Sequence, residues 1–157
     1  MRAKQLYELI ITPTLKELNL YSENAAKLLL LTAAQESNVG KYIKQVKGIA
    51  LGIYQCEPET HEDIVVNFLN YHSELRRLVA KVALIPIYLI GYDELLLSNL
   101  RYSTCICRLH YLRQPSKLPK DVSGMADYWK QHYNTPLGKG TAKSFSNKAA
   151  RIMAEIE

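Results

Sequence analysis

Glu36 is the residue whose position in the sequence best suits acid–base chemistry. It lies three residues after Ala33 and seven after Leu29, so a helix would place it on the stripe that faces the core. The helix is expected to end a few residues later, where the negative end of its dipole disfavours a carboxylate. Burial and dipole together would raise the pKa of the carboxyl, as a general acid near neutral pH requires. On position alone, a side chain that turns into solvent at a frayed helix end is the alternative.

The residues around this acid form a longer pattern. The stretch Ala34-Gln35-Glu36-Ser37 precedes Gly48-Ile49-Ala50-Leu51-Gly52-Ile53-Tyr54-Gln55 and then Pro58-Glu59-Thr60. In order, spacing and residue types this pattern resembles the signature of the soluble lytic transglycosylases, which has a Glu-Ser pair ending a helix, Gly-Ala-x-Gly-Leu-Met-Gln, and Pro-x-Thr opening the next helix. The resemblance implies a lysozyme-like α+β fold and cleavage of the β-1,4 bond between MurNAc and GlcNAc in peptidoglycan.

The same resemblance implies roles for individual residues. Glu36 would be the general acid and then the base, while Ser37 would orient it or the acetamido group of the substrate. Gln55 would line the sugar cleft. Tyr54 stands where Met or Trp is commoner in the family, and its aromatic face could stack on a sugar ring.

A second segment, His132-Tyr133-Asn134-Thr135-Pro136-Leu137-Gly138, resembles the Ala-Tyr-Asn-Ala-Gly-Pro-Gly segment of the same family. By this resemblance the Tyr133 hydroxyl would hydrogen-bond the catalytic carboxylate, and Asn134 would contact the substrate. The order of Gly and Pro differs from the family pattern, and Tyr128 is an alternative to Tyr133. The segment also fits an ordinary turn, which Pro and Gly favour.

A second carboxylate would decide the class of reaction. Hydrolytic glycosidases normally pair an acid with another carboxylate about 5 to 9.5 Å away, and the nearest candidates are Glu57, Glu59 and Asp63. Glu59 and Asp63 fit a charge cluster at a helix N-terminus, whereas Glu57, like Cys56, replaces an apolar residue of the family pattern. With one dependable acid, the resemblance implies a transglycosylase that leaves a 1,6-anhydro sugar and does not use water as the nucleophile.

The elements that must position these residues are mostly helices. Ser22 offers an N-cap for the helix that carries the acid, and Gly40 offers a left-handed end. Glycines and β-branched residues predict an irregular or hairpin insert near residues 41–56. We expect one domain, residues 1–157, predominantly α-helical with this short insert. Apolar periodicity and capping signals predict helices over residues 3–20, 23–40, 58–69, 93–113, 123–133 and 141–156.

Charge restricts the class of partner. The net charge of +5 favours cell wall, nucleic acid or a membrane surface, or serves solubility alone. The basic C-terminal third, with Tyr128, Trp129 and Tyr133 interleaved, could track DNA or wall polymer, but a solvated helix face explains it equally. The longest apolar run, Val82–Tyr92, is too short to span a bilayer.

Metal and cofactor chemistry finds little support in the sequence. The four histidines lack metal-ligand spacing, and the chain has no glycine-rich phosphate loop. Neither a metal nor another cofactor is therefore expected. The three cysteines are odd in number, and we expect them to be reduced and buried.

The set of features is also similar to that of short proteins in bacteriophage particles, which open the wall during infection. This setting implies a virion location, action in the bacterial periplasm or cell wall, and contacts with peptidoglycan glycan strands and other virion proteins. The N-terminus, with Glu8 and Pro13 soon after Arg2 and Lys4, does not read as a secretory signal. A different class stays open, a structural or ejected virion protein that keeps the fold while its catalysis is weak or lost.

Overall fold

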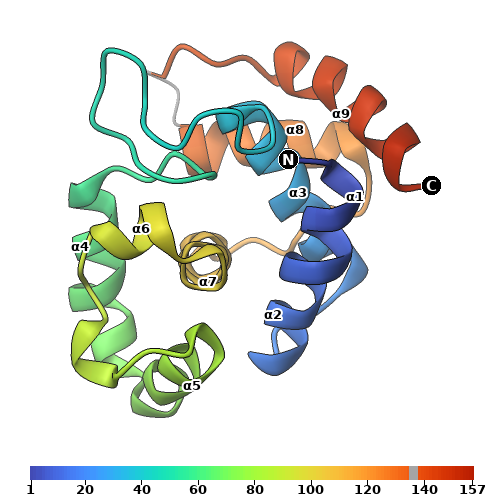
Figure 1. The fold of residues 1–157 in the computed structure, drawn as a ribbon. Coiled ribbons are helices and arrows are strands. Elements are labelled where there is room, and N and C mark those ends of the chain that lie inside the picture. The colour runs from blue at the N-terminus through green and yellow to red at the C-terminus, as the bar shows by residue number, and fades with distance from the viewer. Residues whose placement is uncertain (135–137) are drawn as a thin grey trace.

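The computed structural model describes residues 1–134 and 138–157, and the chain is predominantly α-helical. Its elements are α1 (Ala3–Gln5), η1 (Leu6–Ile11), α2 (Thr12–Glu17), α3 (Glu23–Ser37), α4 (Pro58–Asn67), η2 (Leu69–Tyr71), α5 (Ser73–Ala83), η3 (Ile87–Leu89), α6 (Glu94–Ser98), α7 (Leu100–Leu112), α8 (Val122–Trp129), η4 (Lys130–Asn134) and α9 (Ala142–Ile156). Figure 1 shows α7 end-on near the middle, with α4, α5 and α6 on one side and α1 and α2 on the other. In the same view α8 and α9 lie above α7, and both α3 and α8 contact α9.

α3 begins where the sequence predicts and ends slightly earlier. The Ser22 hydroxyl accepts a hydrogen bond from the backbone N–H of Ala25 at 3.0 Å, which is the expected N-cap. The helix ends at Ser37, before the expected glycine terminator, because Asn38 already has a left-handed backbone with φ of 53°. Asn tolerates this conformation better than most residues. Glu36 therefore lies in the last turn of the helix.

The helix expected over residues 93–113 is two helices, α6 and α7. Asn99 separates them, with an extended backbone and a side-chain oxygen that accepts a hydrogen bond from the N–H of Tyr102 at 2.9 Å. Its side-chain nitrogen donates to the carbonyl of Ala83, also at 2.9 Å. An Asn that caps the following helix interrupts the preceding one, and apolar periodicity alone does not reveal this break.

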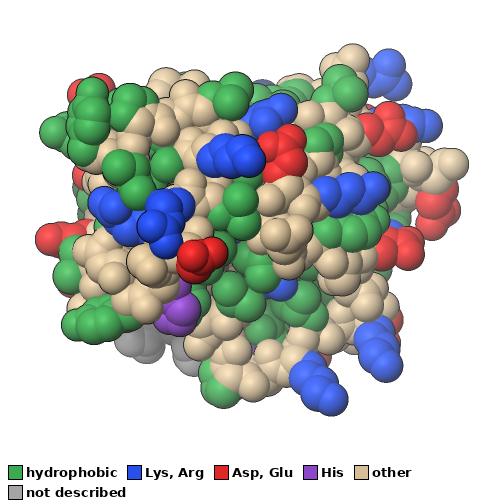
Figure 2. All heavy atoms as spheres, turned by 90° about the horizontal axis from the view of Figure 1, so that it is seen from below, with side chains coloured by type: hydrophobic (Ala, Val, Ile, Leu, Met, Phe, Trp, Pro, Cys, Tyr) green, Lys and Arg blue, Asp and Glu red, His purple; other side chains and the backbone are tan. Residues whose placement is uncertain are grey.

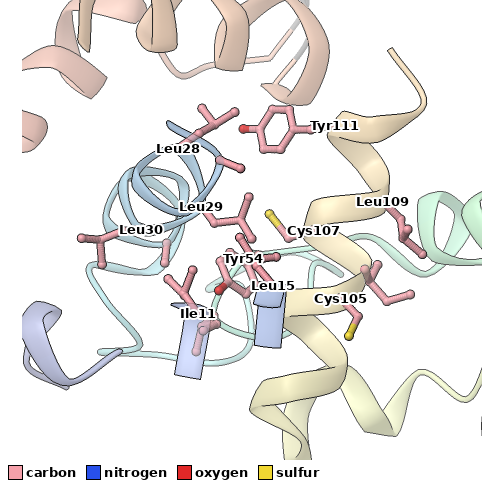
Figure 3. Packing of buried hydrophobic residues seen from close by; sticks show 14 of the residues in the cluster. Ile11, Leu15, Leu28, Leu29, Leu30, Tyr54, Cys105, Cys107, Leu109 and Tyr111 are labelled. Carbon is pink, nitrogen blue, oxygen red and sulfur yellow. The ribbon is translucent and has the colours of Figure 1, made fainter. Parts of the chain in front are cut away.

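Part of the core lies where α3 and α7 face each other (Figure 3). Leu29 and Tyr54 lie between these helices in Figure 3, as part of one cluster of buried hydrophobic residues. Two buried hydroxyl pairs cross this region. The Thr32 and Tyr111 hydroxyl oxygens are 2.8 Å apart, and those of Tyr54 and Thr104 are 2.9 Å apart. These pairs satisfy polar groups that would otherwise be costly to bury, and they fix α7 against α3 and the insert.

The insert, residues 41–56, has no strand longer than a single bridge. Two antiparallel bridges join Lys44 to Leu51 and Leu51 to Cys56, so the expected hairpin is reduced to bridged turns. Gly52 makes the tightest approach to a neighbour. Its φ is +81°, and a Cβ at this position would lie 2.2 Å from the backbone oxygen of Leu96 in α6. The insert can rest against α6 at this distance only with a glycine.

The surface does not concentrate its positive charge on the face shown in Figure 2, where Lys and Arg side chains are scattered among acidic and hydrophobic ones. This face therefore presents no continuous basic stripe of the kind that tracks nucleic acid. Across residues 1–134 and 138–157, none of the helices has the length and apolar character needed to cross a bilayer.

Replacing Gly52 with Ala should lower the free energy of unfolding by at least about 2 kcal/mol, because the left-handed backbone and the contact with the Leu96 carbonyl both oppose a Cβ. Urea denaturation measures the change. Gly48→Ala is the matched control, because a Cβ at Gly48 would meet only the flexible side chain of Gln45. Equal effects of the two substitutions would contradict the contact described between the insert and α6.

Candidate active site

A cavity of about 790 Å³ opens where the end of α3, the insert and η4 meet. Its volume lies within the range of about 300 to 1,000 Å³ that is usual for small-molecule sites. Segments far apart in the sequence therefore share one concave surface. It is lined by Gln35, Glu36, Tyr42, Gln45, Val46, Ala50, Gln55, Cys56, Glu57, Thr60, His110, Trp129, Tyr133, Asn134, Gly138, Lys139 and Gly140.

The Glu36 carboxyl lines this cavity and is largely withdrawn from water. Burial raises its pKa from 4.5 to about 7, although a hydrogen bond from Trp129 and the positive charge of Lys148 both oppose the rise. The indole Nε1 of Trp129 donates to Oε1 of Glu36 at 2.9 Å. One carboxyl oxygen is thus occupied, and the other is the oxygen that can carry a transferable proton. A carboxyl with this pKa can donate a proton near pH 7 and accept one after it ionises.

α9 holds the end of the helix that carries the acid. Ser144, Lys148 and Arg151 are four and three residues apart, a spacing that places them on one face of α9. The Lys148 ammonium donates to the Gln35 carbonyl at 3.3 Å, and the Ser144 hydroxyl donates to the Gln35 side-chain oxygen at 3.4 Å. Arg151 donates to the side-chain oxygen of Asn38 at 3.2 Å. These contacts fix the last turn of α3 and place a cation near its carboxyl end.

Three of the residues predicted to bind substrate line the cavity, namely Gln55, Tyr133 and Asn134. Gln55 has a left-handed backbone with φ of 48°, and its side-chain amide donates to a backbone carbonyl of the insert at 2.9 Å. The Asn134 side-chain oxygen accepts from Lys130 Nζ at 2.7 Å. Residues 135–137 of the second resembling segment lie outside the described residues.

The hydrogen bond expected between Tyr133 and Glu36 is replaced by another. The Tyr133 hydroxyl donates to the backbone carbonyl of Tyr54 and so connects η4 to the insert. Trp129, four residues earlier in the chain, supplies the donor to the carboxyl. Tyr133 and Glu36 thus line the same cavity, but the donor to the carboxyl lies three residues before the resembling segment.

Ser37 and Tyr54 do not line the cavity, so the predicted contacts of these residues with substrate do not hold. The buried Ser37 hydroxyl donates to the Ile53 carbonyl at 2.6 Å and accepts from the N–H of Gly40 at 2.8 Å. Tyr54 is buried in the core, where its hydroxyl is paired with that of Thr104. Both residues attach the insert to the helices behind it, which leaves neither side chain free for a ligand.

Trp129 is the functional residue that the sequence analysis missed. It is the single tryptophan of the chain, and its side chain is 1% exposed. A buried indole usually has a partner for its N–H, and this requirement was the available signal. Gly140 allows the close fit, because a Cβ there would lie 2.5 Å from the indole ring.

The three residues proposed as a second carboxylate differ in whether they line the cavity. Glu57 lines the cavity with an exposed side chain, whereas neither Glu59 nor Asp63 lines it. Asp63 instead accepts a hydrogen bond from Arg113 at 2.7 Å. Within the described residues, Glu57 is thus the one other carboxylate that shares the cavity with Glu36.

Two further ionisable groups line the cavity in their neutral forms. Burial lowers the pKa of His110 to about 4, so its imidazole is uncharged near pH 7. Burial raises the pKa of the Cys56 thiol to about 12, which removes the thiolate needed for nucleophilic attack. All three cysteines are buried and free of disulfides. In the described part of the chain, no three His, Cys, Asp or Glu side chains gather as metal ligands would.

Comparison of the chain with family models, with curated proteins and with solved structures finds no match in any of the three. The chemistry of the cavity and the resemblance of the motifs are therefore the grounds for a functional argument.

The raised pKa of Glu36 predicts that ionising this carboxyl weakens the fold. Because the folded pKa of about 7 exceeds the ordinary value of 4.5, the native state binds the proton more tightly, and stability should fall as pH rises from about 4.5 to 7. Glu36→Gln should remove this loss and raise the free energy of unfolding at pH 8 by about 3 kcal/mol, with no gain at pH 4. Urea denaturation at both pH values measures the effect. Glu57→Gln is the control, and an equal gain in it would contradict the assignment to Glu36.

The charge of Lys148 is expected to hold the pKa of Glu36 down. Lys148→Met keeps the length of the side chain but removes its charge, so the pKa of Glu36 should rise further above 7. NMR titration of the side-chain carboxyl carbons measures the pKa of Glu36. Lys143→Met, at an exposed position of the same helix, should leave the titration unchanged. If both variants titrate like the parent, the charge of Lys148 does not reach the acid.

Proposed function

We propose that this chain is a peptidoglycan lytic transglycosylase with a lysozyme-like fold. The observation that carries the proposal is Glu36, a partly buried, desolvated carboxyl with a pKa of about 7 that lines a cavity of about 790 Å³. A general acid for glycosidic cleavage requires this combination of burial, a raised pKa and access to a ligand. The resemblance of the surrounding motif supplies the substrate class, the glycan strands of peptidoglycan.

In the proposed reaction Glu36 acts twice. It first donates its proton to the oxygen that bridges MurNAc and GlcNAc. The bond between this oxygen and C1 of MurNAc breaks, GlcNAc leaves with a free 4-hydroxyl, and the acetamido group of the substrate supports the oxocarbenium-like state. The resulting carboxylate then accepts the proton of the muramyl 6-hydroxyl, whose oxygen bonds to C1 and closes the 1,6-anhydro ring. Glu36 ends protonated, as it began, and no cofactor or water is consumed.

The exposed position of Glu57, the other carboxylate among the described lining residues, supports a lyase over a hydrolase. Hydrolysis needs a second carboxylate that activates water or attacks the sugar. Within the described lining, Glu57 is the other carboxylate, and its side chain is exposed to solvent at the start of α4.

The arrangement of elements supports the lysozyme-like part of the proposal. The acid ends one helix, a bridged insert follows, and the next helix opens at Pro58. Residues of α8 and η4 then contribute to the lining of the cavity. We place the action of the protein at the bacterial cell wall during phage infection on the strength of the resemblance alone.

Digestion of purified peptidoglycan tests the proposal. The protein should release muropeptides that end in 1,6-anhydro-MurNAc, identified by mass spectrometry, and Glu36→Gln should lower the rate by at least about 1,000-fold because the general acid is lost. Glu57→Gln should retain activity within about threefold if no second carboxylate takes part. Products with reducing ends would show hydrolysis instead. No release at any pH would contradict the enzyme and favour a structural or ejected virion protein with the same fold.

A further inference from the structure

Among the described residues that line the cavity, the rings of Trp129 and Tyr133 are each packed against another aromatic ring. Trp129 stacks on Phe145 with ring centroids 5.3 Å apart, and the indole is almost fully buried. The Tyr133 ring lies 4.5 Å from that of His110 and 5.4 Å from that of Tyr111. Trp129 is therefore part of the packing behind the cavity, and the partly buried Tyr133 ring is packed against two neighbouring rings.

The ring of Tyr42 is in a different situation. Its side chain lies in the insert at 39% exposure, lines the cavity, and is in no aromatic pair with the described residues. Its hydroxyl donates to the backbone carbonyl of Glu36 at 3.1 Å. This bond ties the ring to the residue that carries the acid. A neighbouring lining residue, Val46, extends the exposed apolar surface at 73% exposure.

We propose that Tyr42 is a carbohydrate-binding residue, whose ring stacks on the apolar face of a pyranose next to the bond that Glu36 cleaves. This inference rests on the proposed function, because it assumes that the cavity takes a glycan. It moves the stacking role that the motif suggested for the buried Tyr54 to a residue twelve positions earlier, on the exposed side of the same insert.

The composition of the cavity favours a sugar on this ring. A pyranose has a face of C–H groups and an edge of hydroxyls, so its site needs an aromatic surface with hydrogen-bonding groups around it. Tyr42 supplies the surface, and Gln55 and Asn134 supply amides in the same cavity. The hydrogen bond to the Glu36 carbonyl restricts how the ring can turn, and a ring fixed in advance loses less entropy when the ligand binds.

Binding to the catalytically disabled Glu36→Gln protein tests the inference without turnover. The probe is the tetrasaccharide of β-1,4-linked N-acetylglucosamine, and the signal is the fluorescence of Trp129, the single tryptophan, which lines the cavity. Adding Tyr42→Ala should weaken binding by about tenfold, because the stacking face is lost. Adding Tyr42→Phe keeps the ring and should hold the dissociation constant within about threefold.

Tyr88→Ala is the matched control, because Tyr88 is exposed at 72% and does not line the cavity. It should bind like the Glu36→Gln parent. Equal binding by the Tyr42→Ala and Tyr88→Ala proteins, or no binding by the parent, would overturn the inference. A different result is that binding depends on Tyr42 but the native protein releases no muropeptides. This result would reject the proposed reaction and keep the sugar site, so the two failures are distinguishable.

Discussion

The site depends on the electrostatic environment of one carboxyl, that of Glu36. Its burial disfavours the charged form, and few neighbouring groups stabilise that form. Glu36 is desolvated at the carboxyl end of α3, where the helix dipole also opposes a negative charge. One indole N–H and one nearby ammonium favour the ionised form, and they are too few to restore an ordinary pKa. More donors would fix the group as a carboxylate, as in a structural ion pair. The raised pKa of Glu36 and the loss of stability as the pH rises from about 4.5 to 7 thus come from the same cause.

Residues of the C-terminal third, far from Glu36 in the sequence, supply the groups that stabilise its charged form. Trp129 and Glu36 are 93 positions apart, and Lys148 approaches the same helix end from α9. Because α3, α8 and α9 pack together, the donor and the cation are held by the core and not by flexible loops. The basic residues of this region are in part committed to these internal contacts, which weakens their interpretation as a surface for nucleic acid.

Some residues of the insert attach it to the helices, and others line the cavity. Ser37 and Tyr54 hold it to the helices through buried hydroxyl groups, and Gly52 lets it rest on the backbone of α6. With these anchors in place, Tyr42 and Gln55 can face the cavity although the insert contains only single bridges. A short segment without regular strands can thus form a defined wall, because hydrogen bonds that involve Ser37 and Tyr54 attach it to the core.

Local patterns in the sequence were sufficient to predict several features of the fold and the site. Apolar periodicity and the Ser22 cap located α3, the position of Glu36 within it predicted a buried acid, and the motif around Gln55 identified a second wall of the cavity. Only the tertiary structure decided which way each side chain points and which distant group meets it. Tyr54 turned inward, Trp129 took the role expected of Tyr133, and Asn99 divided one helix into two. Periodicity constrains one helix or loop at a time, whereas partners across the core are selected by packing between elements, which no local spacing encodes.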